Sequence, residues 1–186
     1  MSIRIISGER RGAKLETPEG SDTRPLRDRI REALFSVLRP ELRGLRVLDC
    51  FAGTGAVGLE ALSNFASHAV FIEPLPAAQN MIARNITKLR YEDRAILLKG
   101  FAPQALADRS MPKALIDVVF LMPPYHTTLG EDVLAAPSLQ ALLAPHALAV
   151  HEVHKDQAIP EIPGWSLTES REYGITILRF LRWRPA

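Results

Sequence analysis

Apolar, strand-like segments alternate with amphipathic segments between residues 45 and 153, and this alternation constrains the fold more than any other feature of the chain. Strands that alternate with helices pack as a parallel sheet with helices on both faces, so the pattern predicts an α/β fold. The expected strands are residues 45–50, 69–73, 95–99, 116–121 and 147–153. The expected helices are residues 26–38, 56–65, 76–89, 103–108 and 131–143.

The two ends of the chain depart from this alternation. Residues 3–7 and 13–17 are expected strands around a polar turn at 8–12, and residues 18–25 form a loop. Residues 165–171 and 175–183 are expected strands of a hairpin that turns at 172–174. A mostly parallel sheet ended by an antiparallel hairpin is typical of the Rossmann-like fold of class I methyltransferases. We therefore predict a basic N-terminal β-hairpin arm over 1–25 and a Rossmann-like domain over 26–186.

Charge is distributed unevenly along the chain. The net charge is only +2, but residues 1–46 carry +4 and the remaining residues carry −2. A basic arm on a mildly acidic body fits a polyanionic partner, although a solvated charged surface accounts for the charge equally well. The candidate polyanion contacts are Arg4, Arg10, Arg11, Lys14, Arg24 and Arg27.

Cys50 is the only cysteine, so the chain cannot form an intrachain disulfide and is not a disulfide-stapled secreted domain. We expect its thiol to be a small buried hydrophobe. The apolar run at the N-terminus is too short for a signal peptide, and no segment approaches the roughly 18 apolar residues that span a bilayer. These features predict a cytoplasmic monomer that contacts no membrane.

A glycine-rich turn stands where the first expected core strand becomes a helix. It reads Asp49-Cys50-Phe51-Ala52-Gly53-Thr54-Gly55-Ala56-Val57-Gly58. Glycines let a backbone approach a ligand closely, the helix N-terminus offers free N–H groups, and Gly58 permits close helix–strand packing. Ligands of open parallel sheets bind at this edge. Candidate cofactor contacts here are Asp49, Phe51, Ala52, Gly53, Thr54 and Gly55.

Several ligands are compatible with such a turn. It lacks the Gly-Lys-Ser/Thr of ATP-binding loops. Glu73 ends the next strand, where an acid can hold ribose hydroxyls, but both NAD and S-adenosylmethionine contain a ribose. Asp49 and Phe51 before the glycines favour S-adenosylmethionine. A tight turn without any ligand remains an alternative.

The sequence Met122-Pro123-Pro124-Tyr125 follows the fourth core strand, on the same edge of the sheet as the glycine turn. Two consecutive prolines make a stiff turn that lacks two N–H donors and leaves two carbonyls as free acceptors. Tyr125 can stack on a base. These four residues are the candidate catalytic group.

With these motifs, the chain resembles the RsmD-type 16S ribosomal RNA guanine-N2 methyltransferases over nearly its whole length. The resemblance rests on Arg4-Ile5-Ile6-Ser7-Gly8 with Arg11-Gly12, on Thr23-Arg24-Pro25 with residues 28–35, and on residues 51–55, 58–63 and 123–125. It implies transfer of a methyl group from S-adenosylmethionine to a guanine N2 in small-subunit ribosomal RNA, free or in an assembling 30S particle. Pro-Pro-Tyr loops also serve methyltransferases that act on DNA adenine or on protein.

Two positions depart from that family's pattern. The family has Asp before the two prolines, where this chain has Met122, and a thioether is a poor hydrogen-bond acceptor. The family also has Gly-Asp after the third strand, where this chain has Gly100-Phe101 in the cofactor site. Together the two changes predict reduced activity, with a catalytically impaired RNA-binding homologue as the alternative.

The remaining candidates have simpler interpretations. The five histidines show no metal-ligand spacing beside cysteines, so we expect no zinc site. We expect His126 in a surface loop, although it could line the pocket beside Tyr125. His151, Glu152 and His154 end a strand near this rim and are expected to be solvated. Trp165 and Trp183 are expected to pack in the hairpin.

Overall fold

The computed structural model describes residues 3–17, 25–108, 111–112, 115–158 and 160–184, without the side chains of 25–27. The loop expected at 18–25 lies almost entirely outside these residues. Among the described residues, seven strands form one sheet in the order β3-β2-β1-β4-β5-β7-β6. The five on the β3 side are parallel, and β7 pairs antiparallel with both β5 and β6. The strands are β1 Arg46–Asp49, β2 His68–Glu73, β3 Ala95–Lys99, β4 Ile116–Leu121, β5 Leu143–His154, β6 Trp165–Tyr173 and β7 Thr176–Trp183.

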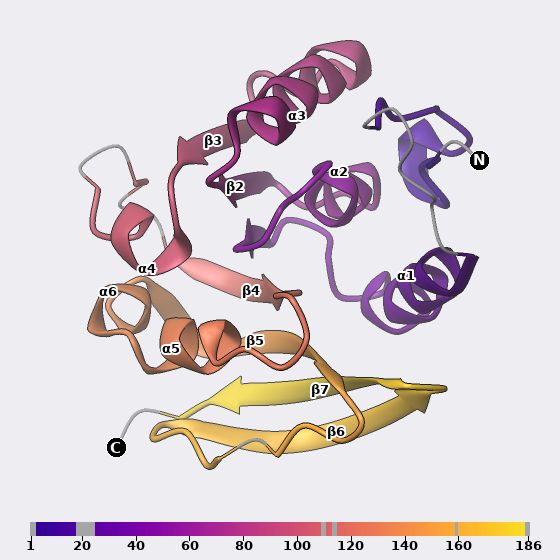
Figure 1. The fold of residues 1–186 in the computed structure, drawn as a ribbon. Helices are drawn as coiled ribbons and strands as arrows, with labels where there is room; N and C mark the ends of the chain where they lie inside the picture. The colour runs from indigo at the N-terminus through magenta and orange to yellow at the C-terminus, as the bar shows by residue number, and fades with distance from the viewer. Residues whose placement is uncertain (1–2, 18–24, 109–110, 113–114, 159, 185–186) are drawn as a thin grey trace.

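Helices cover both faces of this sheet, as the alternating pattern predicts (Figure 1). One hydrophobic core joins the sheet to α1 Pro25–Leu38, α2 Ala56–Ser63 and α3 Pro76–Leu89. A second core on the other face joins it to α4 Ala102–Ala105, α5 Leu129–Ala135 and α6 Pro137–Gln140. The Rossmann-like fold with an antiparallel hairpin at its end is therefore confirmed.

The helix predicted over 131–143 is wrong. The segment holds α5 and α6, which are separated at Ala136, and β5 already begins at Leu143. Pro137 explains the break, because a proline pushes the preceding residue out of the helical region, and Ala136 has ψ 125°. Ala136 N still donates to Val133 O and so closes the end of α5.

The N-terminal arm is less regular than the two predicted strands. Its β-structure is one antiparallel bridge between Arg4 and Lys14, and the turn contains the 3-10 helix η1 Gly8–Arg10. Ile5 N donates to Ala13 O and Leu15 N donates to Ile3 O, so the arm folds back on itself. Ile5 and Leu15 are buried in the first core.

Other expectations about the core are confirmed. Cys50 is buried, and burial raises the pKa of its thiol well above the ordinary value. The Trp165 and Trp183 rings are buried with their centroids 5.3 Å apart. No helix among the described residues is both long and apolar enough to cross a bilayer.

Candidate active site

The carboxyl ends of β1, β2 and β4 lie side by side and bring three distant sequence segments to one edge of the sheet. Asp49 pairs with Phe71 of β2 and with Phe120 of β4, and β2 ends two residues later at Glu73. The glycine turn follows β1 and the Pro-Pro-Tyr loop follows β4, which confirms their predicted placement. Parallel strands present their carboxyl ends together, so the register alone juxtaposes these loops.

Glu73 supports the glycine turn through a hydrogen bond to the turn's backbone. It is buried, with 5% of its surface exposed. Its Oε2 accepts a hydrogen bond from Gly53 N at 2.8 Å and its Oε1 accepts one from Leu75 N at 2.9 Å. Each carboxylate oxygen has two acceptor positions, so a further donor such as a ribose hydroxyl can still bind.

Asp49 lies beneath the turn and not on its surface. It is 1% exposed, and Gly58 N donates to its Oδ2 at 3.0 Å. Burial raises the pKa of this carboxyl to about 7, against the opposing effect of the backbone N–H groups of Gly58 and Phe51. Asp49 thus holds the start of α2 in place. Because its pKa is about 7, its protonated and charged forms are both populated at neutral pH.

Close packing under the turn depends on Gly58, as expected from the sequence. A Cβ at this position would lie 2.3 Å from the Phe71 ring on β2. Because Gly58 has no side chain, α2 can pack closely against the sheet at this point. Gly53 and Gly55 have φ values of 55° and 78°, which side-chain-bearing residues seldom adopt.

Apolar side chains line the outer rim of this edge. Leu75 and Phe101 are each 64% exposed, which is unusual for large hydrophobic residues. Gly100 N donates to Glu73 O at 3.1 Å, so the loop that follows β3 is hydrogen-bonded to the end of β2. A Cβ at Gly53 or Gly100 would meet open space. The backbone at both glycines is therefore open on the side where a side chain would stand.

The Pro-Pro-Tyr loop leaves the sheet beside this space. Met122 is half-buried and packs against the first core, Pro123 is buried and Pro124 is exposed. Thr127 Oγ1 donates to Pro124 O at 2.8 Å. The prediction of two free proline carbonyls is therefore wrong for Pro124, because the next turn of the chain supplies it with a donor.

Tyr125 is tied to the C-terminal part of the sheet. Its hydroxyl donates to Glu152 Oε1 at 2.8 Å and lies 2.5 Å from Thr176 Oγ1. Because the single phenolic proton goes to the carboxylate, Thr176 donates to the Tyr125 oxygen. The ring also meets His154 edge-on, with centroids 5.5 Å apart. These contacts fix the ring direction at the end of β5.

His151 corrects one expectation. It is fully buried, so it is not a solvated rim residue, and neither ring nitrogen has a hydrogen-bond partner among the described residues. Burial lowers the pKa of the imidazole to about 4, with a further contribution from Arg179. The ring is so close to α5 that a Cβ on Gly130 would lie 2.2 Å from its Nε2. Glu152 and His154 are half-buried, and His126 is exposed as expected.

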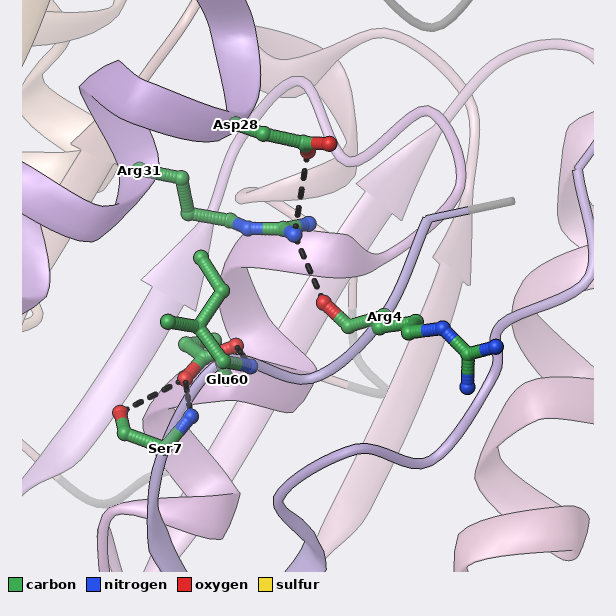
Figure 2. Close-up of polar contacts among 6 residues, drawn as sticks. Arg4, Ser7, Asp28, Arg31 and Glu60 are labelled. Atoms are coloured by element: carbon green, nitrogen blue, oxygen red, sulfur yellow. Dashed lines mark hydrogen bonds and ion pairs between the residues drawn. The ribbon is translucent and has the colours of Figure 1, made fainter. Parts of the chain in front are cut away.

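A buried carboxylate docks the N-terminal arm on α2 (Figure 2). Glu60 is fully buried and accepts three hydrogen bonds of 2.8 Å, from Ile6 N, Ser7 N and Ser7 Oγ. Ser63 Oγ donates to Ser7 O at 2.6 Å from the same helix. The arm therefore stands in a fixed position relative to the glycine turn that begins α2.

Arg31 connects the arm to α1. It is 7% exposed, and its Nη2 donates to Arg4 O at 2.7 Å and to Asp28 Oδ1 at 3.2 Å (Figure 2). Burial lowers the pKa of this guanidinium, and the charges of Glu60 and Asp28 oppose that effect. Sequence reasoning missed Glu60 as a docking residue. Its signal was a charge inside an apolar helical run, since a buried charge needs partners.

The predicted cations of the arm differ in their exposure. Arg4, Arg11 and Lys14 are exposed and available to a partner. Arg10 is half-buried, its Nε is sealed from solvent, and its guanidinium lies 5.8 Å from the centre of the Tyr91 ring. Arg24 and the side chain of Arg27 fall outside the described residues. Within the described part of the chain, no group of three or more acidic, His or Cys side chains could hold a metal.

Comparison with known proteins agrees with this architecture. A family model described as "Conserved hypothetical protein 95" matches residues 3–182. The chain is 36% identical over 173 residues to ribosomal RNA small subunit methyltransferase D of Escherichia coli, covering 92% of this chain and 85% of that protein. The protein of the same name from Haemophilus influenzae is 32% identical, with 95% and 92% covered.

The chain belongs to the RsmD-type methyltransferase family. The solved structure of a candidate methyltransferase from Escherichia coli, 33% identical, superposes over the whole of both chains with a TM-score of 0.86. The arm, the glycine turn and the Pro-Pro-Tyr loop of this chain therefore lie within a fold that the family shares.

Proposed function

We propose that this chain transfers the methyl group of S-adenosylmethionine to the exocyclic N2 of a guanine in small-subunit ribosomal RNA. The observation that carries the proposal is the single sheet edge at which the glycine turn, Glu73 and the Pro-Pro-Tyr loop meet. Family membership supports the reaction class, and the names of the relatives support the RNA.

The residues at this edge fit S-adenosylmethionine. Glu73 has acceptor capacity for the ribose hydroxyls, and the exposed side chains of Leu75 and Phe101 suit an adenine ring. The N-terminus of the eight-residue α2, directly after the turn, suits the methionine carboxylate. When bound, the cofactor supplies an electrophilic methyl group on a sulfonium sulfur.

The chain's own residues position the nucleophile. Guanine N2 is an aniline-like nitrogen whose lone pair is conjugated into the ring, so it attacks without prior deprotonation. Tyr125 stacks on the base drawn into the site, and the Pro123 carbonyl accepts one hydrogen from the amine. The exposed cations Arg4, Arg11 and Lys14 bind the phosphates of the surrounding RNA.

Transfer of a labelled methyl group tests this function. Naked small-subunit RNA, assembled small-subunit particles, DNA and protein are incubated separately with the chain and labelled cofactor. Incorporation into RNA or particles alone, at guanine N2 by mass spectrometry, is the expected result. Label in DNA adenine or in protein would move the chain to another class of methyltransferase.

Calorimetry separates cofactor identity from activity. We expect binding of S-adenosylmethionine and S-adenosylhomocysteine and no binding of NAD, and binding of NAD alone would contradict the proposal. The residue Met122 favours a second candidate, an RNA-binding homologue without catalysis, because its thioether cannot support the amine. Cofactor and RNA binding without any methyl transfer would identify that case.

A further inference from the structure

Met122 and Glu152 lie next to each other at the sheet edge. In the parallel pair of β4 and β5, Leu121 pairs with His151, and Met122 and Glu152 each follow one residue later. Successive side chains of a strand point to opposite faces, so both residues face the first core and His151 faces α5. Neighbouring strands are about 4.8 Å apart, which is well within reach of a glutamate side chain.

Among the described residues, one oxygen of Glu152 accepts a hydrogen bond. Oε1 accepts the Tyr125 hydroxyl, and that hydroxyl in turn accepts from Thr176, which is fully buried. Oε2 has no hydrogen-bond partner among the described residues, and it is not sealed from solvent. Glu152 is half-buried. The sheet therefore holds a carboxylate by one oxygen, beside the reaction loop, and leaves the other oxygen available.

The geometry points to Glu152 as a catalytic residue, which accepts the hydrogen of the target amine through Oε2. This inference rests on the proposed function. The amine develops positive charge as it attacks, and a fixed carboxylate stabilises that charge more than any neutral group of the loop can. Because Met122 offers only a thioether, the carboxylate comes from the neighbouring strand and not from the loop itself.

The step balances with this assignment. The N2 lone pair forms the new N–C bond while the bond between sulfur and the methyl carbon breaks, and its electron pair stays on sulfur as S-adenosylhomocysteine leaves. The methylated nitrogen then carries one proton too many. That proton passes to Glu152 Oε2 and from there to water.

Other carboxylates near this edge are less suitable. Asp49 lies beneath the glycine turn and is 1% exposed. Glu131 is buried on the opposite face of the sheet, where Gln157 lies 3.4 Å from its Oε1. Glu73 accepts hydrogen bonds from Gly53 N and Leu75 N, and the proposed function gives its remaining acceptor positions to the ribose hydroxyls. Glu152 alone among these four combines a free oxygen with a position beside Met122.

Glu152→Gln is the first test, because glutamine keeps an oxygen for the Tyr125 hydroxyl and replaces the proposed acceptor Oε2 with an uncharged NH2 group that can only donate. We expect kcat for methyl transfer to fall on the order of 100-fold, the typical cost of one charged or preorganised acceptor. The dissociation constant of S-adenosylhomocysteine and the unfolding temperature should stay unchanged. Glu172→Gln, at an exposed glutamate of β6, is the matched control and should retain full activity.

Met122→Asp supplies a carboxylate on the loop itself. In the Glu152→Gln background it should restore at least about tenfold of the lost rate, because it returns an acceptor to the same place. In the parent, where Glu152 already accepts the hydrogen, the gain from the same substitution should be several-fold smaller than in the Glu152→Gln background. A large gain in the parent would overturn the role of Glu152 and would show that the unmodified chain lacks an acceptor.

Binding to a substrate analogue provides a readout independent of catalysis. The methylated guanine is first mapped by mass spectrometry, and an RNA fragment with inosine at that position, which lacks the 2-amino group, is compared with the guanosine fragment. In the presence of S-adenosylhomocysteine, the parent should bind the guanosine fragment about tenfold more tightly than the inosine fragment. This is the typical contribution of one hydrogen bond to a charged acceptor. Glu152→Ala should reduce this preference several-fold, to what the Pro123 carbonyl alone supplies.

The outcomes separate the inference from the function on which it rests. An active parent whose Glu152→Gln variant keeps its rate, or whose Glu152→Ala variant prefers guanosine as strongly as the parent, would overturn the role of Glu152 alone. A parent that transfers no methyl group to small-subunit RNA would overturn the proposed function and the inference together.

Discussion

Two glutamates of this chain, Glu60 and Glu152, hold distant segments in place in different ways. Glu60 is fully buried and both of its oxygens accept hydrogen bonds from the arm. Glu152 is half-buried, and Tyr125 engages one of its oxygens. The hydrogen bonds to both oxygens of Glu60 fit a structural role, because the interior tolerates a charge only when it is well partnered. A carboxylate with one oxygen free is fixed in place and still able to react.

Glu60→Ala should have the largest effect on stability, because it removes the carboxylate that docks the arm on α2. The substitution leaves the part-buried donor Ile6 N and the buried donors Ser7 N and Ser7 Oγ without this acceptor, and it removes a compensating charge from Arg31. We expect the free energy of unfolding to fall by about 3 to 5 kcal/mol. Urea denaturation measures it, with the exposed Glu92→Ala as a control near zero. A loss under about 1 kcal/mol would mean that the arm docks without Glu60.

Asp49 and His151 extend the comparison to buried groups whose pKa values are shifted by burial. The pKa of Asp49 is raised to about 7, so its folded form holds a proton that the unfolded chain loses near pH 4, and stability falls as pH rises towards 7. The pKa of His151 is lowered to about 4, so stability falls instead as pH drops from 6.5 towards 4. Between about pH 4 and 6.5 the two effects oppose each other.

Replacing either titratable residue should reveal the pH dependence that the other one gives to stability. Asp49→Asn should make the unfolding free energy rise with pH between about 4 and 6.5, and His151→Phe should make it fall over the same range. The slopes amount to changes on the order of a few kcal/mol, and the parent should be flatter than both variants. Thermal unfolding across this pH range measures the effect. Parallel curves for all three proteins would contradict these pKa values.

The exposed cations of the arm should affect RNA binding through their charge, whereas Glu60 affects stability by docking the arm. Arg11→Glu with Lys14→Glu changes two exposed side chains and should leave the unfolding free energy within about 0.5 kcal/mol of the parent. Affinity for small-subunit RNA should fall at least about tenfold at low salt, and the difference should shrink as salt increases. S-adenosylhomocysteine binding serves as the control. Arg10 is a poorer choice, because it packs over Tyr91.

Glu152→Ala completes the comparison with a much smaller effect on stability than Glu60→Ala. The half-buried side chain makes one hydrogen bond, so we expect a loss of at most about 1 kcal/mol in the urea-derived free energy. The same variant should lose most of its methyl transfer. A loss of stability as large as that of Glu60→Ala would make Glu152 a structural residue and erase the distinction between the two glutamates.

Local patterns in the sequence determined the elements of the fold. Helix α3 and strands β3 and β4 fall at their predicted bounds, and the glycine turn and the Pro-Pro-Tyr loop stand at their predicted strand ends. Periodicity and turn chemistry act over a few residues, so the sequence displays them directly. The same patterns failed at α5 and α6, where apolar periodicity runs through Pro137 although the backbone cannot.

Only the tertiary structure decided which polar groups meet. Ser7 and Glu60 are 53 residues apart, Tyr125 and Glu152 are 27 apart, and Tyr125 and Thr176 are 51 apart. Such partnerships follow from the pairing of β4, β5 and β7 and from the docking of the arm on α2, and no local signal encodes them. His151 shows the same limit: its neighbours along the chain suggest a solvated rim, and the helix packed over it excludes water.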